Sequence, residues 1–302
     1  MPEIIQGVLA ALLTPRAGDG AVDLDGFERN IEFALAAGVD GFAVGTATGE
    51  YAVASLDERR KLTERAAKAI RGKASLLVCA GAGRLEDVVE LGRHALRHKA
   101  SAVLVPPPHF YPYEADDIDA FYREAARRIA GPVVVYNIPG FSTGIDLQSY
   151  VKLVRASAHI VGIQEGSGKL EMLDNLAARP DLNCWRLLGN DAVFLSGLEK
   201  SSFTAAVSGP AGVVPELVLS LQKSWASGDR DRYRTLARHF EDLLTRLGKY
   251  PIPWALKWIA QAREWYEPGF PLPLSEERRR QSVAFSKWFE GWWVKLGPHL
   301  IH

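Results

Sequence analysis

Two short apolar runs of the chain end in polar side chains that could do chemistry. One run ends at Tyr136 and the other at Gln164, and a turn rich in Gly and Ser follows the second. Runs of this kind, rich in β-branched residues, are typical of buried strands. A phenol can donate a proton, and a carboxamide can bind a carbonyl or hydroxyl oxygen. These two side chains are therefore the first candidates for a site that binds a small molecule.

The rest of the chain predicts the elements that position them. Eight strand-like runs alternate with segments of helical period, and no linker divides them. The strand-like runs are Val8–Leu13, Gly41–Val44, Leu76–Ala80, Ala102–Val105, Val133–Asn137, Ile160–Gln164, Trp185–Gly189 and Phe203–Ser208. The helical segments between them are Leu24–Ala37, Leu56–Ile70, Leu85–His98, Asp116–Ile129, Leu147–Val154, Leu170–Ala178 and Ala192–Glu199. This α/β pattern predicts a (β/α)8 TIM barrel over residues 1–212.

Residues 213–302 predict a C-terminal helical extension that packs on the barrel. Its predicted helices are Leu217–Ser227, Arg230–Leu247, Ile252–Tyr266 and Glu276–Leu296. Trp254, Trp258 and Trp265 are expected on one face of the third helix, and Phe285, Trp288 and Trp292 on one face of the fourth. We interpret these aromatic faces as packing surface, with a subunit contact or an aromatic lid as the alternative.

Composition excludes several classes of partner. Lys plus Arg and Asp plus Glu both number 36, so no net field attracts nucleic acid or an anionic membrane. The apolar run near the N-terminus is too short for a signal peptide or a membrane span, and we expect a cytoplasmic protein. Cys79 and Cys184 lie far apart in the sequence, which predicts reduced core residues and no disulfide or thiolate metal site.

The carboxyl ends of the strands are where a barrel of this kind carries its chemistry. That rule selects Thr14, Gly45–Glu50, Cys79, Pro106–Tyr113, Tyr136, Asn137, Gln164, Glu165, Gly189–Asp191 and Ser208–Gly212. No histidine is evidently paired with Cys79, so a barrel-lining role is favoured over a nucleophile there.

Two of these segments resemble the motifs of a known family. Gly45-Thr46-Ala47-Thr48-Gly49-Glu50 and Tyr136-Asn137-Ile138-Pro139 are similar to the G-[GT]-[ST]-T-G-E and Y-N-x-P motifs of the N-acetylneuraminate lyase and dihydrodipicolinate synthase family. The resemblance covers nearly the whole chain. It implies a pyruvate aldolase-like lyase without a cofactor, which binds a 2-keto acid, usually pyruvate, as a homotetramer or dimer. It also implies substrate-binding roles for Ala47, Thr48, Gly189 and Val214.

The resemblance implies a Schiff base that this chain cannot form at the matching position. In the family a lysine in a G-[IVL]-K-[ED] context attacks the keto carbon, and the iminium acts as an electron sink. Here the segment reads Gly162-Ile163-Gln164-Glu165, so Gln164 stands at the lysine position. The lone pair of an amide nitrogen is delocalised into the carbonyl, so the nitrogen cannot form an imine.

The family's proton relay is also altered. Tyr136 matches the strand-5 tyrosine, but the hydroxyl position of the strand-2 loop holds Ala47. Phe110 matches a second tyrosine that reaches across a dimer contact, although a shift of one residue would place Tyr111 there. The segment 140–144 lacks the arginine that dihydrodipicolinate synthases carry, which disfavours binding of aspartate semialdehyde.

Other residues offer weaker routes to catalysis. Lys169 lies five positions beyond Gln164 and could reach back over the mouth, but an exposed lysine at a helix start is the favoured interpretation. Lys249 and Lys257 belong to the helical extension and are weaker candidates still.

No metal site is predicted from the histidines. His94 and His98 are spaced i, i+4 without the Glu of H-E-x-x-H, and we interpret them as a solvated helix face. His109 alone lies near the mouth, and one ligand does not make a site.

The sequence therefore supports one leading hypothesis and two alternatives. The leading hypothesis is a family member that binds a small 2-keto or 2-hydroxy carboxylic acid and uses Tyr136 for acid–base chemistry of the lyase or hydratase type, with Gln164 polarising an oxygen of the ligand. The first alternative is a non-catalytic carboxylate-binding or regulatory homologue. The second is a Schiff-base aldolase that uses Lys169.

Overall fold

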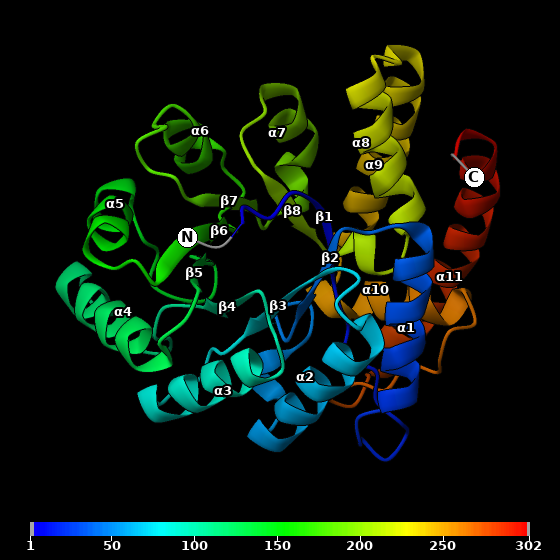
Figure 1. Cartoon of the computed structure of the whole chain (residues 1–302). Coiled ribbons are helices and arrows are strands. Elements are labelled where there is room, and N and C mark those ends of the chain that lie inside the picture. Colours follow the sequence, from blue (N-terminus) through cyan, green and yellow to red (C-terminus); the bar gives the residue numbers. More distant parts are fainter. Residues whose placement is uncertain (1–2, 301–302) are drawn as a thin grey trace.

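The computed structural model describes residues 3–300 and contains a closed barrel of eight parallel strands. The strands pair in chain order and β8 pairs with β1, as Figure 1 shows. They are β1 Gly7–Ala11, β2 Gly41–Val44, β3 Ser75–Cys79, β4 Ala102–Val105, β5 Val133–Asn137, β6 Ile160–Glu165, β7 Trp185–Leu188 and β8 Ala205–Ser208. The predicted (β/α)8 barrel is confirmed.

Among residues 3–300, seven α-helices connect the strands and four follow β8. The connecting helices are α1 Leu24–Ala37, α2 Leu56–Ile70, α3 Leu85–Arg97, α4 Ala115–Ile129, α5 Leu147–Ala156, α6 Glu171–Ala177 and α7 Phe194–Lys200. Those that follow are α8 Pro215–Ser227, α9 Arg230–Leu247, α10 Ile252–Ala262 and α11 Glu276–Leu296. Helix α2 begins with the capping box that its sequence encodes, in which Ser55 and Glu58 satisfy each other's backbone amides. In the part of the chain that the structure describes, no helix is long and apolar enough to cross a membrane.

The helix predicted over Ile252–Tyr266 is shorter than expected. Helix α10 ends at Ala262, and Glu264 takes a left-handed conformation with φ 59°. Trp265 therefore does not continue the face of Trp254 and Trp258, and its ring instead contacts Phe33 at 4.3 Å between centroids. The predicted single aromatic face was wrong for Trp265.

Apolar side chains fill two layers, one inside the barrel and one between the sheet and its helices. Trp185 and Leu187 point into the barrel with Leu9, Leu77 and Leu104. A side chain at Gly162 would meet the Trp185 backbone, so the glycine of β6 is required by its neighbour on β7. This packed interior fixes the strands at whose carboxyl ends the polar residues lie.

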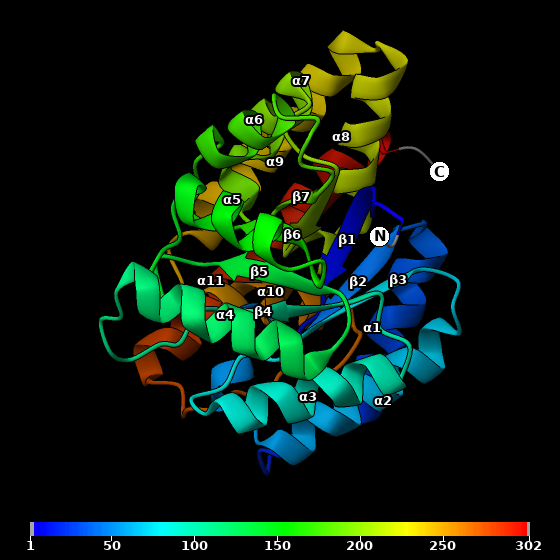
Figure 2. The ribbon, with the colours of Figure 1, turned by 60° about the vertical axis from the view of Figure 1, so that its left-hand side comes forward.

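The last helices pack on one end and one side of the barrel. Helix α8 packs against α1 and α7 and thus lies in the outer ring, whereas α10 lies at the barrel end and α11 packs against α10, at the right-hand edge of Figure 1 (see also Figure 2). On α11, Phe285 contacts Trp288 and Trp288 contacts Trp292, and Phe285 also contacts Trp258 of α10. The domain boundary after residue 212 stays a prediction.

Candidate functional site

A cavity of about 380 Å³ opens at the carboxyl ends of the strands. Its walls come from the ends of β1, β5, β6 and β8, from the loops after β2 and β7, and from α9 and α10. Tyr136, Gln164, Thr46, Thr48 and Asp191 supply polar side chains, and Ile138, Phe141, Val207, Leu244 and Leu256 supply much of the apolar wall. A small polar molecule matches this lining.

Tyr136 and Gln164 lie side by side because β5 and β6 pair at these residues. Both side chains are buried and line the cavity. Side chains alternate along a strand, so the next residues face outward. There Asn137 donates to the Glu165 carboxylate at 2.7 Å, and Glu165 also accepts from the Ser167 amide. Asn137 and Glu165 therefore hold the strand ends in place while Tyr136 and Gln164 face the ligand space.

The Tyr136 hydroxyl is held in its protonated form. It accepts a hydrogen bond from the Ala47 backbone amide at 3.3 Å. Burial raises the pKa of Tyr136 well above its ordinary value, and the neighbouring Cys79 adds to the shift. The phenol therefore keeps its proton at neutral pH and can donate it to an oxygen of a ligand.

The loop between β2 and α2 presents hydroxyls and a backbone amide to the cavity. Thr46, Ala47 and Thr48 line it, and within the described chain the Thr48 amide donates no backbone hydrogen bond. An unpaired amide of this kind can bind a carboxylate. The substrate-binding roles of Ala47 and Thr48 stay predictions, and both residues lie in the cavity wall.

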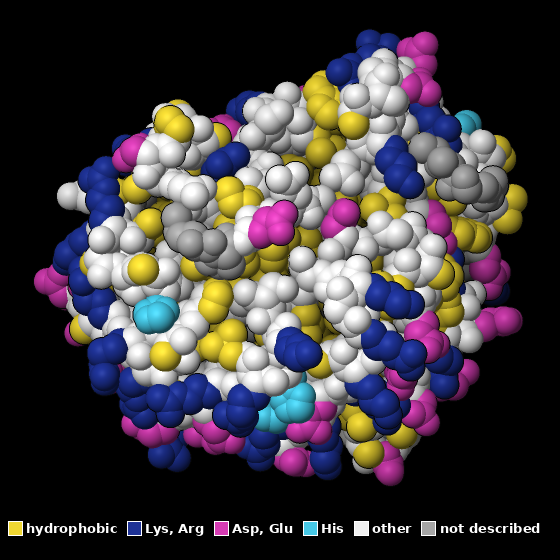
Figure 3. Space-filling model, in the orientation of Figure 1, with side chains coloured by type: hydrophobic (Ala, Val, Ile, Leu, Met, Phe, Trp, Pro, Cys, Tyr) yellow, Lys and Arg dark blue, Asp and Glu magenta, His cyan; other side chains and the backbone are white. Residues whose placement is uncertain are grey.

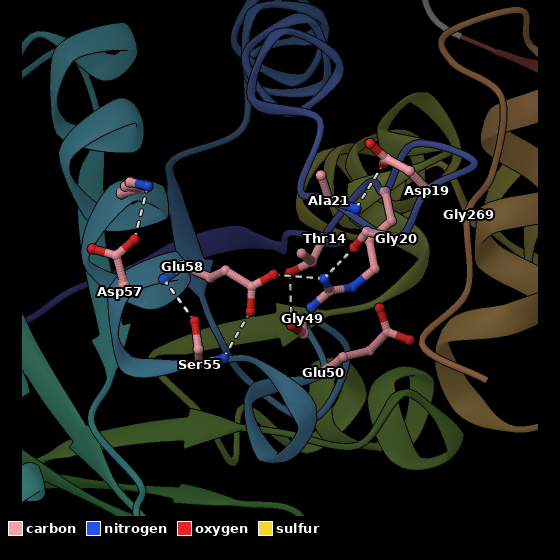
Figure 4. Close-up of polar contacts among 12 residues, drawn as sticks. Thr14, Asp19, Gly20, Ala21, Gly49, Glu50, Ser55, Asp57, Glu58 and Gly269 are labelled. Carbon is pink, nitrogen blue, oxygen red and sulfur yellow. Dashed lines mark hydrogen bonds and ion pairs between the residues drawn. The ribbon is translucent and has the colours of Figure 1, made fainter.

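A polar network fixes the base of that loop. The Thr14 hydroxyl donates to the Gly49 carbonyl at 2.7 Å, and Arg16 forms an ion pair with Glu58 at 2.7 Å (Figure 4). Thr14 and Arg16 are two residues apart, so they link this loop to the start of α2, where the same Glu58 caps the helix.

Glu50 ends the loop and forms a buried ion pair with the helical extension. The Lys257 ammonium donates to the Glu50 carboxylate at 2.6 Å and to the Gly269 carbonyl at 2.9 Å. Lys257 is fully buried, and burial lowers its pKa although Glu50 opposes the shift. The sequence marked Lys257 only as a weak nucleophile candidate. It did not predict the ion pair, because Glu50 lies 207 residues away in the chain.

Two polar atoms in the cavity wall have no hydrogen-bond partner in the described structure. They are the carboxamide oxygen of Gln164 and the hydroxyl of Thr46. Leaving such a group unpaired costs about 1–3 kcal/mol. A ligand with a hydroxyl and a carboxylate group would supply partners for both atoms.

Asp191 is a site residue that sequence reasoning selected only as part of a strand-end segment. It lies directly after β7, and its carboxylate accepts hydrogen bonds from the Gly209 amide at 3.1 Å and from the Ser208 hydroxyl. Although the residue keeps some exposure, burial of the carboxyl group raises its pKa to about 6. A pKa in this range suits a group that exchanges protons near neutral pH, and the burial that produces it could not be read from the sequence.

The other predicted site residues divide between the cavity and the surface. Gly189 lines the cavity, and a side chain there would collide with Gln164. Val214 is buried at the start of α8 and is not part of the cavity wall. Phe110 and Tyr111 are 87% and 62% exposed and also lie outside the wall of this single chain.

Among the described residues, no lysine, arginine or histidine lines the cavity. Lys169 and Lys249 are exposed, and Lys257 is occupied by Glu50. His109 packs edge-on against Tyr51 outside the wall. Cys79 is buried, and burial raises the pKa of its thiol, which disfavours a thiolate nucleophile.

Sequence comparison relates the chain to two kinds of enzyme. The pattern of the Dihydrodipicolinate synthetase family matches residues 4–288. A 4-hydroxy-tetrahydrodipicolinate synthase of Phenylobacterium zucineum is 30% identical over 295 residues, which cover 93% of this chain and 96% of the relative. An N-acetylneuraminate lyase of Rhizobium meliloti is 28% identical over 251 residues, which cover 82% and 83% of the two chains.

Solved structures show the same fold. A dihydrodipicolinate synthase from Aquifex aeolicus superimposes with a TM-score of 0.87 at 24% identity, over 95% of this chain and 98% of the other. A catalytic lysine mutant of the Ruminococcus gnavus sialic acid aldolase gives a TM-score of 0.88 at 20% identity, over 98% and 99% of the two chains. At these identities the likeness concerns the fold.

Proposed function

Because the chain belongs to the dihydrodipicolinate synthetase family, we propose that its cavity binds a small 2-keto or 2-hydroxy carboxylic acid and acts on it without a lysine Schiff base. The observation that carries the proposal is the pair of unpartnered polar atoms, on Gln164 and Thr46, in a cavity that no described lysine lines. The Thr48 amide and the hydroxyls of Thr46 and Thr48 are suited to the carboxylate of such an acid.

The remaining groups support acid–base chemistry of the lyase type. Gln164 hydrogen-bonds to the keto or hydroxyl oxygen and orients it. For a 4-hydroxy-2-keto acid, ionised Asp191 removes the proton of the 4-hydroxyl, the bond between C3 and C4 breaks to leave a carbonyl at C4, and the electrons of that bond move into the keto group as an enolate. Tyr136 then donates its proton to the enolate oxygen, which yields an enol and a carbonyl product. Without an iminium the electron sink is weaker, so we expect slow turnover.

Reductive trapping tests the absence of the imine. The protein is incubated with pyruvate and borohydride and weighed by mass spectrometry. We expect no adduct on any lysine, while pyruvate or a 2-hydroxy acid raises the melting temperature in a saturable manner. An adduct that maps to Lys169, or to any other lysine, would overturn the lysine-free mechanism.

The variant Gln164→Lys is the matched positive control. Its amine would enter a cavity that already holds Tyr136 and the Thr48 amide, so we expect pyruvate to be trapped at residue 164. If neither the variant nor the natural chain is protected by any keto or hydroxy acid, the proposed ligand class is wrong.

A non-catalytic carboxylate-binding homologue is the second candidate, and the missing nucleophile favours it. It shares the ligand class but predicts saturable binding with no turnover in a screen of keto and hydroxy acids. Turnover that is lost in Tyr136→Phe while binding persists would decide for the enzyme.

We also propose that the chain forms a homo-oligomer, a dimer or a tetramer. Phe110 and Tyr111 expose large apolar rings on the loop after β4, in edge contact with each other. A second copy of the chain would bury them. One solved relative is described as a monomeric dihydrodipicolinate synthase variant, so the fold itself does not require assembly.

A further inference from the structure

A cluster of two histidines and a glutamate lies on the outside of the barrel, away from the cavity wall. Glu64 comes from α2, His94 from the last turn of α3, and His98 is the C-cap residue directly after that helix. One possible ligand atom from each side chain lies within 4.8 Å of the other two. We propose that Glu64, His94 and His98 bind one divalent transition-metal ion, of which Zn²⁺ is the prototype.

The position of His94 differs from the sequence prediction of a solvated helix face. Its side chain is only 8% exposed because α2 packs over it. Nε2 lies 3.4 Å from a Glu64 carboxylate oxygen, yet it is buried and has no hydrogen-bond partner among the described residues. A buried imidazole nitrogen that faces a carboxylate without a hydrogen bond needs a partner, and a metal ion bound between the two groups would supply it.

His98 completes the site from the next turn of the helix. Residues four apart lie on the same face of a helix, and the two rings are 4.6 Å apart. His98 Nε2 lies 4.0 Å from the same Glu64 oxygen. Zinc bonds of about 2.0–2.2 Å place tetrahedral ligand atoms roughly 3.4 Å apart, so a small rotation of the half-exposed His98 ring closes the set.

The donor set favours a transition-metal ion and leaves a coordination position for water. Two imidazoles and one carboxylate suit Zn²⁺, Co²⁺ or Ni²⁺ better than Ca²⁺ or Mg²⁺, which prefer oxygen ligands alone. Three protein ligands leave at least one position for solvent. Figure 3 shows histidine side chains among acidic and basic ones over the edge where Figure 1 places α2 and α3. The ion would join these two helices.

Calorimetry on the untagged protein tests the site. After treatment with a chelator, the chain is titrated with Zn²⁺, and Co²⁺ is used as a spectroscopic probe. We expect one ion per chain, a higher melting temperature with Zn²⁺, and visible absorption from bound Co²⁺. His98→Ala and Glu64→Gln, which change exposed or half-exposed side chains, should each weaken Zn²⁺ binding by at least about tenfold.

His159→Ala is the matched control, because it removes an exposed histidine outside the cluster. It should bind Zn²⁺ as the natural chain does. The proposal is overturned if the natural chain shows no stoichiometric binding, or if His98→Ala and Glu64→Gln bind as tightly as His159→Ala. Because none of the three ligands lines the cavity, binding of a keto acid should be equal with and without Zn²⁺.

Discussion

Asp191 is the residue at the mouth whose charge changes nearest neutral pH. Burial raises its pKa from 3.8 to about 6, so the carboxyl group is neutral below that pH and ionised above it. The stability that the fold gains from the protonated form is fully present below pH 3.8 and is lost as the pH rises to about 6. Above that pH the cavity carries a negative charge close to where the carboxylate of the proposed ligand would lie.

We therefore predict that affinity for a small carboxylate falls as the pH rises from 5 to 8. Repulsion of about 1–2 kcal/mol across the cavity corresponds to a loss on the order of tenfold. Calorimetric titration at both pH values measures it. In Asp191→Asn the affinity should become independent of pH over this range; an equally steep dependence in that variant would show that another group is responsible.

At the scale of single residues, the sequence predicted which side chains lie at the strand ends but not their partners from other elements. Tyr136 and Gln164 were both expected at strand ends, and the structure pairs β5 with β6 at these residues. The partners of Lys257 and His94 come from other elements, and only the packing of α10 and α2 determines them. A raised pKa such as that of Asp191 likewise depends on burial, which no local pattern encodes.

At the scale of elements, the buried pair between Glu50 and Lys257 joins α10 to the loop that follows β2. Breaking such a pair from one side leaves an uncompensated buried charge and costs about 3–5 kcal/mol. We predict that Glu50→Gln and Lys257→Met each destabilise the protein by about this amount, as measured by urea unfolding.

The double variant should recover much of that loss, because it leaves no charge unpaired. Arg234→Ala removes an exposed pair with Asp231 and should leave the midpoint unchanged. Additive losses in the double variant would contradict a coupled pair. Ligand affinity should fall in both single variants, since the same loop carries Thr46 and Thr48.

The elements themselves were largely predictable because their signals are local. Apolar runs and the capping box at Ser55 gave strands and helices whose ends agree with the structure to within a few residues. Helix α10 was predicted too long, since Trp265 continued the apolar period and the left-handed turn at Glu264 carries no glycine to mark it.

At the scale of the whole molecule, the exposed rings of Phe110 and Tyr111 lead to a prediction about assembly. Sedimentation should show a species larger than the 33.2 kDa chain. The double variant Phe110→Asp, Tyr111→Asp should shift it toward smaller species, because the charges would be buried in the contact. Val53→Asp changes another exposed apolar residue and serves as the control. A natural chain that sediments as a monomer would refute the oligomer.

The barrel was predictable as a whole because eight alternations leave few other topologies. The residues of the C-terminal helices that close the mouth of the barrel were not predictable. Leu244 and Leu256 reach the cavity from helices that the sequence placed only in an extension packed on the barrel.

The lack of cationic side chains among the described residues of the cavity wall has a consequence for how a ligand arrives. With no described lysine or arginine in the wall, hydroxyls and a backbone amide would have to balance the carboxylate of the proposed acid. Such dipoles act at short range and draw no ligand from a distance, and the chain has no net charge to do so. At about pH 5, where Asp191 is neutral, the proposed acid should therefore reach the mouth by unsteered diffusion, and its rate of association should depend little on ionic strength.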